Sequence, residues 1–133
     1  MQSNLNVHSF ITAAAYSAKT LVYLSAEGTV TALTDQTKVP LGVLQSASTA
    51  AKLTADVAIP ESGQYVEVTA GDTVTAGKLQ MAMAGGLLDD CASAGSDNKW
   101  SVGVAQNAGS SGSTVTLCWR PTVINTSSTL GGN

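Results

Sequence analysis

The chain has 133 residues, of which 44% are hydrophobic and only 11% are charged, against roughly 25% charged in an average soluble domain. This length suits one domain, or two small lobes packed closely together. The net charge of −3 and the lack of a Lys/Arg cluster argue against partners such as nucleic acid or an anionic membrane surface. A polar, weakly charged surface is typical of a protein that lies against other proteins.

The first nine residues, 1–9, are predicted to form an extended N-terminal arm. They show no basic region followed by an apolar run, so no signal peptide is expected, and no apolar run in the chain reaches the ~20 residues of a membrane span. No partner strand for this segment is evident within the chain. Two apolar side chains of this segment, Leu5 and Val7, and the Phe10 side chain that directly follows it are the candidate partner-binding residues. The alternative is a frayed terminus.

Residues 10–121 are predicted to form β-structure almost throughout. The clearest alternation of apolar and polar side chains lies in residues 51–59 and 114–120. Shorter strands are expected at Leu21–Leu24, Thr29–Leu33, Tyr65–Thr69 and Leu79–Met83, with Gly-containing turns between them. Short, evenly spaced strands predict an all-β fold, a small β-sandwich or barrel. The Ala-rich stretch 12–18 is expected to form one or two helical turns at most.

The two halves of this region, about residues 10–60 and 64–121, repeat a pattern. A Gly-Val-x-Gln segment begins at Gly42 and again at Gly103, 61 residues later, and Pro60 and Pro121 are separated by the same offset. A near-constant offset with small slips indicates an internal duplication that gives two similar lobes. The strands that contain Leu41–Gln45 and Val102–Gln106 should then hold equivalent places in the two lobes.

A tight β-corner is predicted at Gly71 to Gly77, because Gly and Asp favour such turns. The same pattern occurs in biotinyl and lipoyl carrier domains, whose modified lysine would stand at Ala82. The corner is therefore interpreted as structural. Trp100 and Trp119 are expected to pack in the core or at its rim, with an interface anchor as the alternative for Trp119.

No catalytic, cofactor-binding or metal-binding residues are predicted, and the chain is not expected to be an enzyme. His8 is the only histidine, so neither a catalytic triad nor a His-based zinc site can be assembled. Asp89 and Asp90 are adjacent carboxylates, but they lack the alternating spacing of a calcium loop, and a solvated turn is the favoured interpretation. Cys91 and Cys118 are expected to remain reduced thiols, although a disulfide between them is geometrically conceivable.

Residues 122–133 are predicted to be a Ser/Thr/Gly-rich C-terminal tail. Arg120 and Pro121 mark the expected exit of the last strand. The tail is either a frayed end or a segment that orders on a partner. The stretch from Thr126 to Asn133 also resembles a linker into a fibre shaft.

Four segments resemble, in this order, the small capsid decoration (cement) proteins of tailed bacteriophages. They are the Gly71-to-Lys78 corner, Gly86-Leu87, the Val102-to-Ala105 strand and the closing Ser113-to-Leu117 strand. The resemblance covers residues 64–121 well and residues 10–60 more weakly. It implies a β-sandwich or barrel that binds the outer face of a capsid lattice, commonly as an oligomer, and that has no active site.

The expected function is therefore that of a structural virion protein that stabilises the capsid shell. Its expected partners are the major capsid protein and other copies of itself, with a trimer favoured. Its expected location is the capsid exterior, after assembly in the host cytoplasm. The alternative is the base or attachment domain of a head fibre or spike. A carbohydrate-binding β-module is third, because only six aromatic residues are present and no binding platform is apparent.

Overall fold

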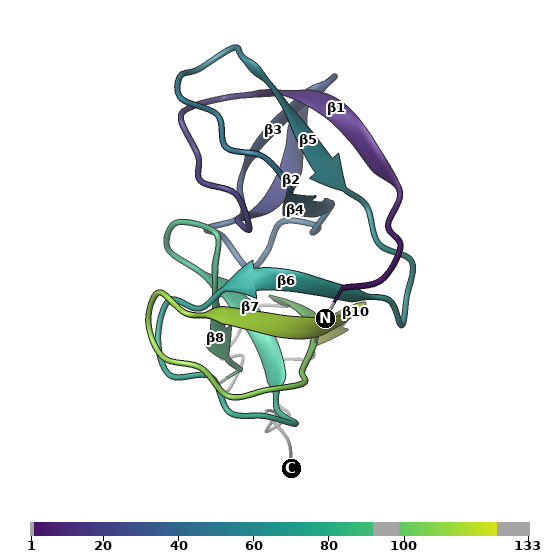
Figure 1. Cartoon of the computed structure of the whole chain (residues 1–133), viewed down its shortest axis with the longest axis vertical. Coiled ribbons are helices and arrows are strands. Elements are labelled where there is room, and N and C mark those ends of the chain that lie inside the picture. Colours follow the sequence, from purple (N-terminus) through teal and green to yellow (C-terminus); the bar gives the residue numbers. More distant parts are fainter. Residues whose placement is uncertain (1, 92–98, 125–133) are drawn as a thin grey trace.

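A computed structural model describes residues 2–91 and 99–124 of the chain. The described residues form ten strands and no helix, which confirms the all-β prediction (Figure 1). The strands are β1 (Val7–Thr12), β2 (Leu21–Ala26), β3 (Thr29–Ala32), β4 (Gly42–Leu44), β5 (Thr54–Ala58), β6 (Tyr65–Thr69), β7 (Leu79–Met83), β8 (Leu87–Asp90), β9 (Lys99–Ala105) and β10 (Thr114–Ile124).

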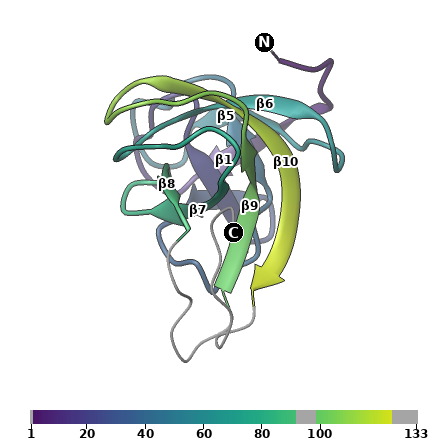
Figure 2. The same cartoon turned by 90° about the horizontal axis from the view of Figure 1, so that it is seen from below.

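The strands make two lobes, one above the other in Figure 1. The first five strands close into a barrel in the order β1-β3-β2-β4-β5, and β5 pairs back with β1. The last five strands form a sheet in the order β6-β10-β9-β7-β8, which Figure 2 shows from below. Renaming β6–β10 as β1–β5 turns one pairing scheme into the other. Even the parallel contact of β1 with β3 has its counterpart, a parallel bridge between Ala70 and Leu88.

Hydrogen bonds confirm that the strands containing Leu41–Gln45 and Val102–Gln106 hold equivalent places. The Gln45 amide donates to the Asp56 carbonyl at 2.7 Å, and the Gln106 amide donates to the Thr116 carbonyl at 2.8 Å. Each glutamine side chain also donates to the carbonyl two residues before it. A Cβ at Gly42 or Gly103 would overlap a carbonyl oxygen of the neighbouring strand, so both segments need glycine at that place.

The offset is not constant along the chain. The Lys19 amide donates to the Leu44 carbonyl, and the Gly77 amide donates to the Ala105 carbonyl, so Lys19 corresponds to Gly77, 58 residues later. Both residues have positive φ, 66° for Lys19 and 84° for Gly77. The sequence hides this equivalence, because glycine is the residue expected there and the first lobe uses a lysine.

The lobes differ where the first strand of each lobe meets the third. In the barrel, the Ile11 amide donates directly to the Gly28 carbonyl at 2.9 Å. In the second lobe, residues 19–21 of the first lobe lie between the equivalent groups. The Thr69 amide donates to the Lys19 carbonyl at 3.0 Å, and the Leu21 amide donates to the Gly86 carbonyl at 2.8 Å. The first barrel is closed, and the second sheet is held open by the first lobe.

The lobes share a hydrophobic core. Leu21, Leu33 and Val43 from the first lobe are buried in one cluster with the core side chains of the second lobe, among them Leu117 and Trp119. A separate cluster fills the barrel and includes Val22, Val30, Leu44, Ala55 and Val57. Each fully buried aliphatic side chain stabilises the fold by roughly 1.5–3 kcal/mol. The shared cluster therefore couples the two lobes.

The expectation that the N-terminal segment lacks a partner strand within the chain is wrong. Residues Val7–Thr12 form β1, which pairs antiparallel with β5 from Val7↔Ala58 to Ile11↔Thr54. The stretch before it runs along the outer edge of β6: the Ser3 amide donates to the Tyr65 carbonyl at 2.9 Å, and the Tyr65 amide donates to Ser3 Oγ at 2.7 Å. The partner was missed because apolar and polar residues do not alternate strictly in Val7–Thr12.

Two strand boundaries also need correction. The alternation in residues 51–59 predicts a strand from 51, but β5 starts at Thr54, because Lys52 has φ 67° and interrupts the extended backbone. The last strand does not end at Pro121. It continues to Ile124 after a shift of register between Trp119 and Thr122, a place where a proline without an N–H is tolerated. The rest of the predicted tail lies outside the described residues.

Candidate functional site

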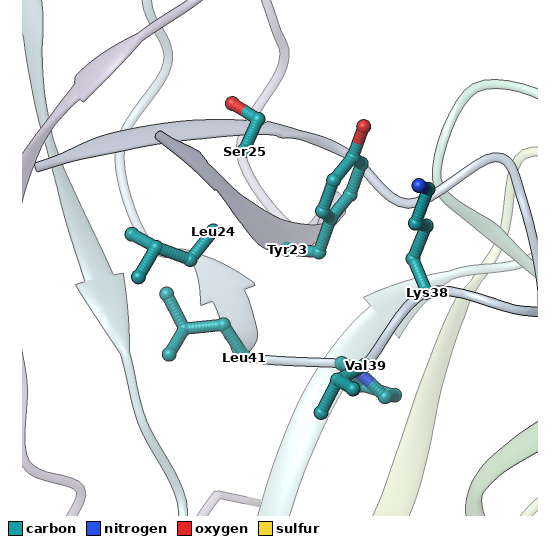
Figure 3. Close-up of a pocket in the computed structure, with 7 residues that line it drawn as sticks. Tyr23, Leu24, Ser25, Lys38, Val39 and Leu41 are labelled. Atoms are coloured by element: carbon teal, nitrogen blue, oxygen red, sulfur yellow. The ribbon is translucent and has the colours of Figure 1, made fainter. Parts of the chain in front are cut away.

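The candidate site is a cleft of about 520 Å³ in the first lobe (Figure 3). Two segments form it, the second half of β2 and the stretch that leads into β4. The lining residues are Tyr23, Leu24, Ser25, Lys38, Val39, Pro40 and Leu41.

The cleft opens because two neighbouring strands pair only briefly. β2 and β4 pair at Leu21↔Val43 and Val22↔Gly42, and the Leu41 amide adds one more bond to the Val22 carbonyl at 3.0 Å. Pro40 has no N–H and cannot extend the ladder. The two segments therefore separate, and Leu24 and Val39 are left 50% and 61% exposed.

The cleft has an apolar floor and a polar rim. In Figure 3, the side chains of Leu24 and Leu41 face each other and Val39 lies farther along the same segment, while the hydroxyl of Tyr23, the hydroxyl of Ser25 and the ammonium group of Lys38 point to the opposite side. Ser25 is held in place by Thr31, whose hydroxyl donates to Ser25 Oγ at 2.7 Å. Apolar area with a few polar groups at its margin is suited to binding.

The structure separates the three predicted arm residues. Leu5 packs against the core shared by the lobes, and Phe10 packs against the barrel core. Among the three, only the Val7 side chain is exposed, with 47% of its surface accessible. Two of the three apolar side chains are thus used within the chain, and binding of a partner by this segment stays a prediction.

The carboxylate pair lies in strand β8 and not in a turn. Asp90 accepts hydrogen bonds from the Thr75 amide at 2.9 Å, from the Thr75 hydroxyl at 2.8 Å and from Gln80 Nε2 at 2.7 Å. Desolvation by itself raises the pKa of Asp90, but these bonds outweigh it and the pKa is lowered. Desolvation raises the pKa of Asp89. Within the described residues, no group of three His, Cys, Asp or Glu side chains could hold a metal ion.

The other residues considered from the sequence have structural places. Trp119 is 3% exposed in the shared core, as the core interpretation predicts. Cys91 and Cys118 are free thiols. Burial raises the pKa of Cys91 to about 11, so this thiol is a poor nucleophile at neutral pH. His8 is exposed in β1, opposite Val57. No helix among the described residues is long and apolar enough to cross a membrane.

The cleft was missed in the sequence. Leu24 belongs to a predicted strand, and Leu41 belongs to the first of the two repeated strands. One usable signal is the proline that directly precedes Leu41, since it predicts that strand pairing stops there.

The fold matches a solved structure. The head fibre gp8.5 N base of bacteriophage phi29 superposes with a TM-score of 0.67 at 16% sequence identity, over 87% of this chain and 94% of that chain. No protein-family model matches the chain. No curated protein matches it either. At this level of identity, the likeness establishes a shared all-β fold.

Proposed function

We propose that the chain is a structural protein of a bacteriophage virion and serves as the base of a head fibre or similar appendage. One observation carries the proposal: its fold is similar, over nearly the whole length of both chains, to a phage head fibre base. The cleft with its exposed Leu24 and Val39 supports a binding role. A fibre base must bind two things, the head and the rest of the fibre.

The second candidate is a decoration protein that stabilises the shell. It is favoured by the resemblance of the second lobe to cement proteins and by the low content of charged residues. In both cases the proposed place is the exterior of the capsid, the proposed partner is the major capsid protein, and no enzymatic activity is expected. Self-association, with a trimer favoured, belongs to the same proposal.

Co-sedimentation with assembled capsid shells tests the shared part of the proposal. We expect the purified chain to pellet with shells and to stay in the supernatant without them. Cryo-electron microscopy of the decorated shells and their resistance to heat then separate the candidates. A fibre base should occupy isolated positions and leave heat resistance unchanged, whereas a decoration protein should cover the lattice and raise it. Failure to pellet with shells at micromolar concentration would rule out both.

A further inference from the structure

One side chain of the first lobe fills a gap in the second lobe. The loop before β4 places Gln36 between β7 and β9. Gln36 Nε2 donates to the Ala82 carbonyl at 2.7 Å, and the Gln36 carbonyl accepts from the Trp100 amide at 2.7 Å. The carboxamide and the backbone of one loop residue thus join two strands that have separated from each other.

The cleft of the first lobe is the same gap without such a residue. β7 and β9 pair at Leu79↔Val104 and Gln80↔Gly103, in the way that β2 and β4 pair at Leu21↔Val43 and Val22↔Gly42. In this correspondence Ala82 is equivalent to Leu24, and Trp100 is equivalent to Val39. Leu24 and Val39 both line the cleft.

The backbone groups that Gln36 uses in the second lobe have available counterparts in the first. The Val39 amide has no hydrogen-bond partner within the described residues. The Leu24 carbonyl points to the same side of β2 as the Val22 carbonyl, because groups two residues apart on a strand face the same neighbour. The cleft therefore offers one acceptor and one donor at the positions that a loop such as that of Gln36 would use.

Charge supports the same comparison. Lys38 at the rim of the cleft corresponds to Lys99 in the second lobe. Hydrogen bonds from Thr37 are the largest influence that lowers the pKa of Asp35, and the positive charges of Lys38 and Lys99 contribute. In the second lobe, the loop that fills the gap thus places Asp35, which directly precedes Gln36, close enough to Lys99 for their charges to interact.

We propose that the cleft of the first lobe binds an exposed loop of a different protein, and that this loop carries an Asn or Gln side chain directly after an acidic residue. The amide would donate to the Leu24 carbonyl, the loop backbone would accept from the Val39 amide, and the acidic residue would face Lys38. The leucines and Val39 would pack against the loop. A second copy is not the occupant that we choose, because the Gln36 loop of that copy is already engaged in its own second lobe.

The first test uses a cyclic peptide of the sequence Thr-Asp-Gln-Thr-Lys, that of residues 34–38, as the probe. In ¹⁵N–¹H spectra of the full chain, we expect saturable shifts of the Leu24 and Val39 amides. A matched peptide with Gln→Ala should bind about tenfold more weakly, since it loses the amide donor. No saturable shift at millimolar peptide, shifts confined to the second lobe, or equal binding of the two peptides would overturn the proposal.

Two variants provide a matched comparison. Val39 and Val123 are 61% and 48% exposed, and only Val39 lines the cleft. V39E should repel the acidic residue of the probe and weaken binding about tenfold or more, whereas V123E should leave it unchanged. Thermal denaturation of both variants verifies folding. Equal binding by V39E and the parent chain would overturn the proposal. If the parent chain self-associates and V39E does not, the occupant is a second copy, and the proposal is overturned as well.

The choice of a shell protein as the partner rests on the proposed function. Co-sedimentation with shells tests this choice separately from the peptide experiment. If the parent chain pellets with shells and V39E pellets less than V123E, the occupant belongs to the shell. If the parent chain does not pellet, the proposed function fails, while the peptide experiment still decides the chemistry of the cleft. If the parent chain and both variants pellet equally, the cleft does not bind a shell protein and this part of the inference is overturned.

Discussion

At the scale of single residues, the contact between the lobes depends on places where no side chain fits. Gly86 is the clearest. Its carbonyl accepts from the Leu21 amide, and its φ is 74°. A Cβ there would lie 2.6 Å from the Leu21 carbonyl oxygen and 2.6 Å from Thr20 Cγ2. The neighbouring Gly85 has a similar φ of 85° but open surroundings, with no atom nearer than 3.8 Å.

G86A should therefore destabilise the chain more than G85A. Both variants place alanine in the left-handed region, at a cost of roughly 1–2 kcal/mol. G86A adds overpacking at the lobe contact, roughly 1–3 kcal/mol more. Urea denaturation of both variants measures the difference. Equal free energies of unfolding would mean that the lobes do not approach as closely as described.

The pKa of Asp90 predicts how stability depends on pH. Its folded pKa is lowered below the ordinary value of 3.8, because hydrogen bonds from Thr75 and Gln80 outweigh desolvation. The unfolded state then binds its proton more readily, so the contribution to stability is present above that value and is lost as pH falls through the folded pKa. In D90N, the free energy of unfolding should fall less steeply with decreasing pH below about 4 than in the parent chain. Parallel curves for the two proteins would contradict the assignment.

At the scale of elements, the N-terminal segment has two separate tasks. Residues 2–4 cover the edge of β6, and Val7–Thr12 supply a barrel strand. Removing residues 1–4 should expose the Tyr65 and Glu67 amides, whose acceptors are Ser3 Oγ and Gln2 Oε1. Hydrogen exchange should accelerate at these two amides and stay unchanged at Val57 in β5.

A longer truncation should behave differently. Removing residues 1–9 also takes Val7, His8 and Ser9 out of their pairing with β5, so the barrel should lose stability. Denaturation of the two truncated chains side by side decides the matter. A chain lacking residues 1–9 that is as stable as one lacking residues 1–4 would restore the view of this segment as a free arm.

The elements also show what the sequence could and could not predict. Alternation located β10 well, since Val115, Leu117 and Trp119 are all buried. The Gly-Val-x-Gln segments at Gly42 and Gly103 predicted the equivalence of β4 and β9. The cleft could not be found in this way, because an open gap depends on where pairing stops between β2 and the residues before β4. Alternation within one strand carries no information on that.

At the scale of the whole molecule, the shared core predicts that the two lobes unfold together. Both tryptophans, Trp100 and Trp119, lie in strands of the second lobe, so their fluorescence reports on that lobe and on the core that it shares with the first lobe. Leu44 lies in the barrel cluster, and L44A should cost roughly 2–5 kcal/mol. We expect L44A to move the fluorescence transition as far as the transition seen by far-ultraviolet circular dichroism. A fluorescence midpoint that does not move would show that the lobes unfold independently.

The contact between the lobes is also asymmetric: the second lobe accepts residues of the first, and the first lobe, within the described residues, has no equivalent opening for another lobe. The second lobe joins the first because residues 19–21 of the first lobe lie between the Thr69 amide and the Gly86 carbonyl of the second. In the first lobe, the matching amide of Ile11 and carbonyl of Gly28 already bond to each other. A further unit therefore could not be docked onto the first lobe by the same device without breaking that bond. A fusion that places another copy of residues 64–121 before the first lobe should therefore form a separate domain that does not pack against that lobe in the same way.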